Sequence, residues 1–225
     1  MSRKVWSSME DVFSCLGKND IYVILTGDEL LRDGFKDFGY HHDIDMLVVN
    51  HRRTIDLLGA DCYYYYSDEH YRVNLNGKPA TLGIYELGDD YMDSRWQKEM
   101  LEKRNLDSDG HYVIDAENHL YWMMYHALCQ KRVFPEHYRK RIEYEAREFG
   151  IEATTENQMW GLLEDFLFEK GYGCPYPKVF LERVYAHGFK SIKPTGYNEW
   201  HIKRAMNIPI RVIRKLYRHH IRNRD

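Results

Sequence analysis

The chain has 225 residues, of which 44% are hydrophobic, and its formal charge at pH 7 is −3. This length allows one large domain or two small ones, and the apolar content can support a core. No apolar run approaches the roughly 20 residues of a membrane-spanning helix. Glu10 and Asp11 interrupt the apolar region that a secretory signal would need. The cysteines are scattered without metal-site spacing, as expected for reduced cytoplasmic thiols: Cys15, Cys62, Cys129 and Cys174.

The first half of the sequence predicts a mixture of helices and strands. We expect helices at 9–16, 51–58 and 94–103, and strands at 21–26, 43–49, 62–66, 70–75 and 78–87. Asn76-Gly77 is typical of a type I′ hairpin turn, so the strands on either side of it should pair antiparallel. The expected result is a small mixed sheet with strand 43–49 near its centre.

The second half predicts helices, at 115–131, 135–149, 158–169 and 179–186. Asp115 would cap the first of these, whose apolar residues recur at three- and four-residue spacing along a buried face. The segment 105–111 is rich in turn residues and separates the helices from the α/β part. We expect the two parts to pack together with a substrate cleft between them.

Residues 201–225 differ in charge from the rest of the chain. Eight lysines and arginines stand against one acid, Asp225, with aliphatic residues interleaved. This pattern predicts a basic amphipathic helix that lies on an anionic membrane surface or binds a polyanion such as RNA. It fits equally a helix that packs on the protein body with a solvated basic face.

The strand at 43–49 carries the strongest functional signal. Asp43 and Asp45 are one residue apart, so a strand places both carboxylates on one face, while Ile44 and Met46 point to the other. Like charges this close require neutralisation, and a hard divalent cation that binds oxygen ligands provides it. The alternative interpretation is a pair of exposed acids on an edge strand.

The surroundings of this pair resemble a known superfamily. An apolar strand ends at Thr26-Gly27, Asp28 begins a short helix, and the next strand carries Asp43 and Asp45. This order resembles the nucleotidyltransferase superfamily, which includes DNA polymerase beta, adenylyl- and uridylyl-transferases and the LicD/fukutin phosphotransferases. The chain resembles in particular uncharacterised bacterial nucleotidyltransferase-like proteins, some of which are tied to surface-polysaccharide synthesis. The resemblance covers residues 20–95 well and the helical remainder loosely.

The resemblance implies an α/β (α+β) fold, in which the small mixed sheet of the nucleotidyltransferase fold is followed by a helical C-terminal region. The corresponding division is an α/β domain at 1–108, a helical domain at 109–200 and the basic helix at 201–225. The sequence departs from the family pattern at two points. Gly27 is followed by Asp28 instead of a small residue, and the third metal-binding acid would fall near Gly83, which has no side chain.

Glu86 is the only acid within strand 78–87, so we assign it as the third catalytic carboxylate beside Asp43 and Asp45. In a regular strand Glu86 faces away from the position of Gly83, and only a bulge would bring it round. The alternative is a site of two carboxylates, completed by water and substrate phosphate, as magnesium tolerates. A degenerate, non-catalytic site is the third interpretation.

Further candidates follow from charge and from the resemblance. Cations near the metal would form charge-assisted bonds to phosphate, and histidines beside the aspartates could contact it. The run from His126 to Lys131 is similar to one in related proteins. Each of these residues also has a structural interpretation, as a surface charge or a hydrogen-bonded helix residue. The candidate nucleotide- and substrate-binding residues are Thr26, Gly27, Arg32, His42, His126 and Lys131.

The resemblance implies a transferase that uses Mg²⁺ or Mn²⁺ bound by Asp43 and Asp45. The donor would be a nucleoside triphosphate or a CDP-linked compound. The acceptor would be a hydroxyl of a surface polysaccharide or lipid-linked glycan. Two alternatives stay open: an RNA- or protein-modifying nucleotidyltransferase of the toxin type, and an inactive binding or scaffold subunit. We expect a cytoplasmic protein that reaches the inner membrane surface through residues 201–225.

Overall fold

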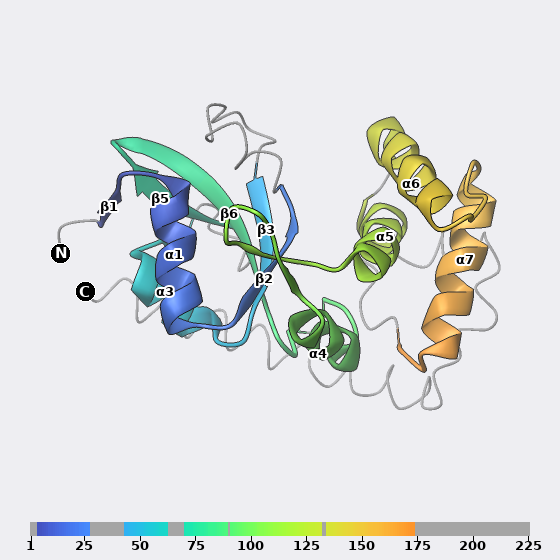
Figure 1. Cartoon of the computed structure of the whole chain (residues 1–225), viewed down its shortest axis with the longest axis horizontal. Coiled ribbons are helices and arrows are strands. Elements are labelled where there is room, and N and C mark those ends of the chain that lie inside the picture. Colours follow the sequence, from blue (N-terminus) through green and yellow to red (C-terminus); the bar gives the residue numbers. More distant parts are fainter. Residues whose placement is uncertain (1–3, 28–42, 63–69, 90, 132–133, 174–225) are drawn as a thin grey trace.

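The computed structural model describes residues 4–27, 43–62, 70–89, 91–131 and 134–173. Within these ranges the chain forms one mixed sheet and a set of helices (Figure 1), as expected for an α/β protein. Several sequence predictions lie outside the described residues. These are the helix that begins at Asp28, the candidates Arg32 and His42, all but the first residue of the strand at 62–66, the helix at 179–186 and the basic helix at 201–225.

The sheet has the order β1-β5-β6-β3-β2-β8-β7, with β4 paired to β5. The predicted hairpin is present, because β5 and β6 pair antiparallel around Asn76 and Gly77. Parallel pairing of β3 with β6 and antiparallel pairing of β3 with β2 place the strand that carries the two aspartates inside the sheet. The strands are β1 (Val5–Trp6), β2 (Tyr22–Thr26), β3 (Asp43–Val48), β4 (Asp61–Cys62), β5 (His70–Leu75), β6 (Lys78–Glu86), β7 (Asn105–Leu106) and β8 (Tyr112–Val113).

The described helices are α1 (Met9–Asn19), α3 (His51–Leu58), α4 (Ser94–Glu102), α5 (Ala116–Tyr125), α6 (Glu136–Glu148) and α7 (Glu156–Glu169). Most begin at a side-chain cap, and Asp115 caps α5 as predicted by accepting a hydrogen bond from the backbone of Asn118. The predicted helix at 115–131 is not uniform. After Tyr125 it widens into a π-helical segment, His126–Gln130, and it ends before Lys131.

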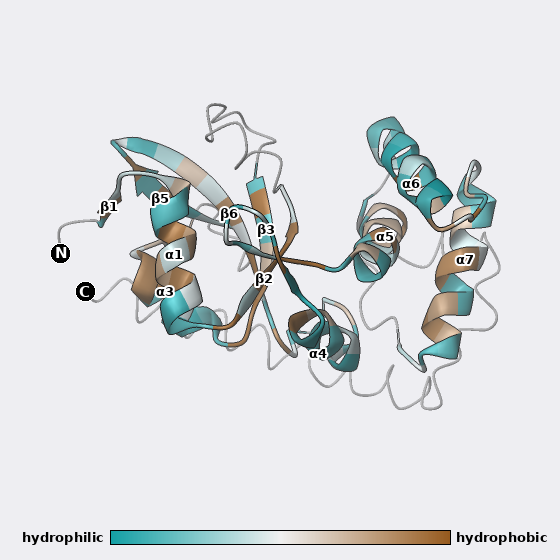
Figure 2. Cartoon of the chain, viewed as in Figure 1, coloured by the Kyte–Doolittle hydropathy of each residue, from teal (hydrophilic) through white to brown (hydrophobic). Residues whose placement is uncertain are grey.

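Two hydrophobic clusters lie on the two faces of the sheet, because alternate residues of each strand point to opposite sides. Ile44, Met46 and Val48 of β3 pack with residues of α1 and α3. Leu47 and Tyr85 point to the other face and pack with α4, α5 and α7. Figure 1 shows the two groups of helices on either side of the strands, and Figure 2 shows the hydrophobic residues along the strands and on the inner side of α1.

The predicted boundary at 108/109 falls within the β7–β8 hairpin, and β8 pairs with β2 in the sheet. Val23 and Leu25 of β2 share a cluster with Trp122 and Leu163 of the helical part. The helices of the second half therefore pack on one face of the sheet, opposite to α1 and α3, and the division into domains stays a prediction. Among the helices of the described ranges, none has the length and apolar character to cross a membrane.

Candidate active site

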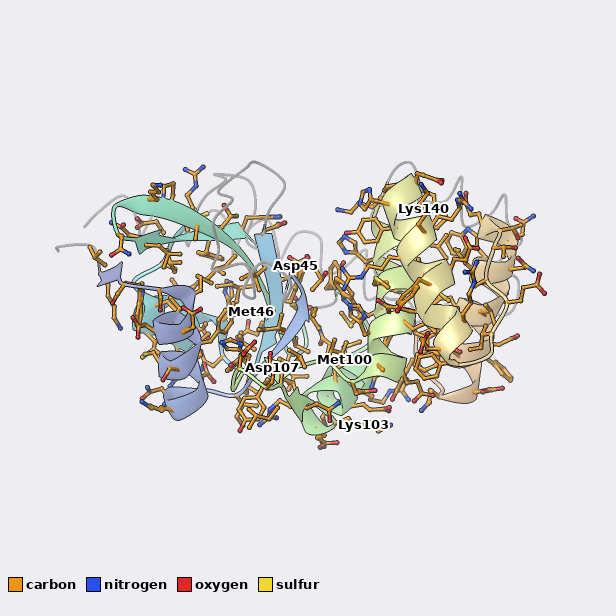
Figure 3. All side chains as sticks on the ribbon, turned by 45° about the horizontal axis from the view of Figure 1, so that its top comes forward. Asp45, Met46, Met100, Lys103, Asp107 and Lys140 are labelled. Carbon is orange, nitrogen blue, oxygen red and sulfur yellow. The ribbon has the colours of Figure 1, made fainter. Side chains whose placement is uncertain are left out.

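Asp43 and Asp45 lie on the sheet face that is opposite to Ile44 and Met46, as the alternation of the sequence predicts. Asp45 is 6% exposed, whereas about a third of the Asp43 side chain is accessible. Figure 3 shows Asp45 on β3, in the part of the sheet that faces the helices α5 and α6. A buried carboxylate next to a second carboxylate is costly unless hydrogen bonds or a cation stabilise the charges. The pair is therefore a built feature of an interior strand, and the edge-strand interpretation is wrong.

Thr26 and Gly27 lie directly beside the aspartates. A register shift in the pairing of β2 with β3 brings Thr26 opposite Asp45. Gly27 has a φ of +89°, and a Cβ there would lie 2.7 Å from the Asp43 carbonyl oxygen. Only glycine meets both conditions without strain. The glycine turn therefore lets the end of β2 approach the backbone of β3 at the site, which gives the predicted positions of Thr26 and Gly27 a physical reason.

Gly83 of β6 is paired with Asp45 across the parallel strands. A Cβ at this position would lie 1.9 Å from Oδ1 of Asp45, which is far inside van der Waals contact. The Asp45 carboxylate therefore occupies the space over Gly83 that a side chain would need. An acidic side chain at position 83 could not share this space with the carboxylate of Asp45 in its present conformation.

His70 of β5 lies on the far side of the same glycine. It is the antiparallel partner of Gly83, and its Nε2 lies 3.7 Å from Oδ2 of Asp43. Sequence reasoning missed His70 because the third functional group was sought only among acids. A period-two reading of β5 could have found it, since Tyr71 and Val73 are buried on one face and His70 and Arg72 point to the other.

The structure does not bring Glu86 to the aspartate pair. Its Oε1 accepts a hydrogen bond of 3.1 Å from the backbone N–H of His51, the first residue of α3. This helix packs on the face opposite to the aspartates. The pairing of β6 with β3 is continuous from Thr81 to Glu86, so β6 contains no bulge there that would turn Glu86 towards the aspartates. The Glu86 carboxylate instead accepts a hydrogen bond from a backbone N–H at the N-terminus of α3, where no intrahelical acceptor is available.

His126 and Lys131 lie in the helical part. His126 is 6% exposed, its Nδ1 forms a hydrogen bond of 2.5 Å with the Tyr91 hydroxyl, and its ring stacks on Trp122. Tyr91 in turn packs against Tyr85, whose β3 partner is Leu47, two residues after Asp45. Lys131 lies over the ring of Tyr138, with Nζ 6.0 Å from its centre. His126 is thus connected to the site through aromatic rings, and its binding role stays a prediction.

A groove opens on the hairpin of β5 and β6, near β4. Its volume is about 330 Å³, and its lining includes Asp61, Cys62, Arg72, Asn74 and Pro79. Arg72 is the partner of Thr81, which is in turn the partner of Asp43. Arg72 therefore lies in the same cross-strand row as Asp43, two strands away, and it also lines the groove. A neighbouring cation and concave surface are what an anionic substrate requires.

The aspartate pair offers the oxygen ligands that a divalent metal requires. Asp43 and Asp45 present oxygen donors on one face, and the Asp45 carboxylate lies over Gly83, which has no side chain to displace it. Within the described ranges, however, no three histidine, cysteine, aspartate or glutamate side chains are already grouped as a metal site. The residues therefore fit a cation held by two carboxylates, with its other positions open to water and substrate.

Comparisons with known proteins give little further information. No protein-family model matches the sequence, and no curated protein is significantly similar to it. The chain is similar to the solution structure of the antibiotic-resistance factor ANT(2'')-Ia, with 11% identity and a TM-score of 0.39. The match covers 71% of this chain and 89% of that one. A similarity this distant carries no argument about activity, so the functional interpretation rests on the residues of the site.

Proposed function

We propose that the chain is a metal-dependent transferase that moves a nucleotidyl or phospho group from a nucleotide donor to a hydroxyl acceptor. The observation that carries this proposal is the aspartate pair on an interior strand, with Gly27 packed on one side and the side-chain-free Gly83 on the other. Two adjacent carboxylates with an open position are the protein ligands that phosphoryl and nucleotidyl transfer requires.

Each residue has a distinct role in this proposal. Asp43 and Asp45 would hold Mg²⁺ or Mn²⁺, which when bound would neutralise phosphate charge and orient the donor. Asp45 is fixed by its burial and its position over Gly83. Gly27 lets the end of β2 lie against the backbone of β3 beside the pair, and Arg72 supplies a cation two strands away. Positioning and charge neutralisation would then provide most of the rate.

The acceptor that we propose is a hydroxyl of a glycan, and an RNA or protein acceptor is the alternative within the same reaction class. The groove beside Arg72 provides a surface for the donor or acceptor outside the metal position. Arg32 and His42, which lie outside the described residues, remain proposed phosphate contacts.

A second candidate function is favoured by one observation. The position of the third acid in the family pattern is Gly83, and the Asp45 carboxylate fills the space over it. Glu86 does not replace this acid, because it binds the N-terminus of α3 on the other face. A protein with such a site could bind a nucleotide without turning it over and serve as a binding subunit. This candidate predicts nucleotide binding that survives without catalysis.

The test compares the full chain with the double variant Asp43→Asn/Asp45→Asn and with Asp56→Asn as a control. Asp56 lies on α3, its side chain is 74% exposed, and it is far from the site in the fold, on the opposite face of the sheet. Each protein is incubated with labelled nucleotides and Mg²⁺ or Mn²⁺. Metal-stimulated turnover in the wild type and the control, but not in the double variant, supports the transferase. Binding without turnover in the wild type supports the binding subunit, and absence of metal and nucleotide binding refutes both.

A further inference from the structure

Three residues on neighbouring strands form one row across the sheet. Asp45 of β3 pairs with Gly83 of β6, and Gly83 pairs with His70 of β5. Adjacent strands lie about 4.8 Å apart, so Asp45 and His70 are separated at the backbone by about two such spacings. Any side chain at the middle position would stand between them. Because the middle residue is glycine, the side chains on either side can approach each other.

Asp45 occupies this space, and His70 lies near the second carboxylate of the pair. The Asp45 carboxylate leans over Gly83, as shown by the 1.9 Å between its Oδ1 and an added Cβ. From the other side, His70 places Nε2 3.7 Å from Oδ2 of Asp43. The Asp45 carboxylate thus fills the space over Gly83, and an imidazole nitrogen from β5 lies close to the neighbouring Asp43 carboxylate on the same face of the sheet. His70 and Asp43 are also each about a third accessible, so both can adjust.

The distances suit a shared cation after a small adjustment. Ligand atoms at about 2.1 Å from one metal lie about 3 Å apart when the angle between them is near 90°. The 3.7 Å between the nitrogen and the oxygen exceeds this by less than one ångström. In the described part of the chain the three side chains are not preassembled into a metal site, so binding would have to draw them together. His70 and Asp43, which are partly exposed, would make this movement by side-chain rotation, while Asp45 is held in place by its burial.

We propose that His70 replaces the missing third carboxylate as a metal ligand, so that the site is formed by Asp43, Asp45 and His70. This inference rests on the proposed function, since it concerns the same metal position. It also changes the expected metal. Carboxylate and water ligands suit Mg²⁺ and Mn²⁺ alike, whereas an imidazole ligand favours a first-row transition metal over Mg²⁺. The site is therefore selective for Mn²⁺ over Mg²⁺, and His70 is the residue that causes the selectivity.

The test measures ligation directly by electron spin-echo spectroscopy of Mn²⁺ bound to the full chain. A nitrogen nucleus coordinated to Mn²⁺ modulates the echo. We expect this modulation in the wild type, its loss in His70→Ala and His70→Gln, and its retention in His137→Ala, which changes an exposed histidine of α6. The two variants at His70 guard against a folding defect in either, and thermal unfolding without metal checks each one.

Calorimetric titration provides the second readout. Removal of a ligand should weaken Mn²⁺ binding by about tenfold or more, with a smaller loss for Mg²⁺. His70→Asp should shift the preference towards Mg²⁺. If His70→Ala keeps both the nitrogen modulation and the Mn²⁺ affinity, while Asp43→Asn/Asp45→Asn loses binding, the inference about His70 is wrong and the proposed function stands. If the wild type binds no Mn²⁺ or Mg²⁺, the inference and the metal-dependent function are refuted together.

Discussion

Substitution of Gly83 by alanine separates the stability of the fold from the geometry of the site. The added Cβ would lie 1.9 Å from Oδ1 of Asp45, 3.1 Å from its Cγ and 3.5 Å from its Cα. The last distance is ordinary contact and the second requires a shift of a few tenths of an ångström. Only the carboxylate oxygen must move substantially. The backbone pairing of β3 with β6 therefore survives, and the change falls on the side-chain rotation of Asp45.

The magnitude follows from what moves. Overpacking of a rigid core costs about 1–3 kcal/mol, whereas a side chain forced off its preferred rotamer costs about 0.5–1.5 kcal/mol. Since the clash is with the end of a rotatable side chain, we expect Gly83→Ala to cost about 1 kcal/mol. For a chain of this size that lowers the melting temperature by about 2–4 °C. Metal affinity should fall by about tenfold or more, because one ligand is turned away from the position that it shares with Asp43.

Differential scanning calorimetry without metal measures the first effect, and Mn²⁺ titration measures the second. Gly161→Ala is the matched control, because Gly161 lies within α7 and a Cβ there meets no atom within 4 Å. This control should raise stability by about 0.5–1 kcal/mol and leave metal binding unchanged. Wild-type Mn²⁺ affinity in Gly83→Ala would refute the coupling between the glycine and the Asp45 carboxylate.

Three further predictions concern the surroundings of the site. Gly27→Ala should cost more than 1 kcal/mol in urea unfolding, roughly the cost of a positive φ alone, because its Cβ also meets a backbone oxygen of β3. Glu86→Ala should lower stability by about 1 kcal/mol through the lost contact with the α3 N-terminus, with metal binding and turnover unchanged; loss of turnover in a folded variant would restore Glu86 as a catalytic residue. Burial alone would raise the pKa of Glu99, but hydrogen bonds from Lys103 and Tyr172 outweigh it and lower the pKa from 4.5 to about 2. The charged form is thus favoured in the folded state, so Glu99→Gln should destabilise the protein above pH 4.5, by about 1 kcal/mol after discounting for solvent screening. The difference should disappear as the pH falls towards 2, and a difference that is constant with pH would contradict this reasoning.

Local signals predicted the elements that carry the site. The alternation around Asp43 and Asp45, and the Asn76-Gly77 turn, fixed the face of one strand and the pairing of two others, since period and turn geometry act over a few residues. The role of Glu86 was not predicted, because its partner is the backbone of α3, 35 positions away in the sequence. The period-two pattern of β5 indicates the face on which His70 lies, but not that it meets Asp43, because that contact depends on the register of β5 on β6 and of β6 on β3. Register across three strands depends on the whole fold and not on any short pattern.

The contacts of His126 indicate how the helical part could affect the site without touching a substrate. Along β3 and β6 the row of Asp45 and Gly83 is followed by the row of Leu47 and Tyr85, about 6.7 Å further on. Tyr85 packs on Tyr91 with ring centres 4.3 Å apart, and the Tyr91 hydroxyl meets His126. The row of Asp45 and Gly83 thus lies next to the row of Leu47 and Tyr85, which packs in one cluster with the helices. The π-helical segment begins at His126, and this buried imidazole is linked to the strand that carries Gly83 through Tyr91 and Tyr85. Loss of His126 should therefore loosen the packing of Tyr85 before it alters metal binding, and double-mutant cycles between positions 85 and 126 would measure that coupling.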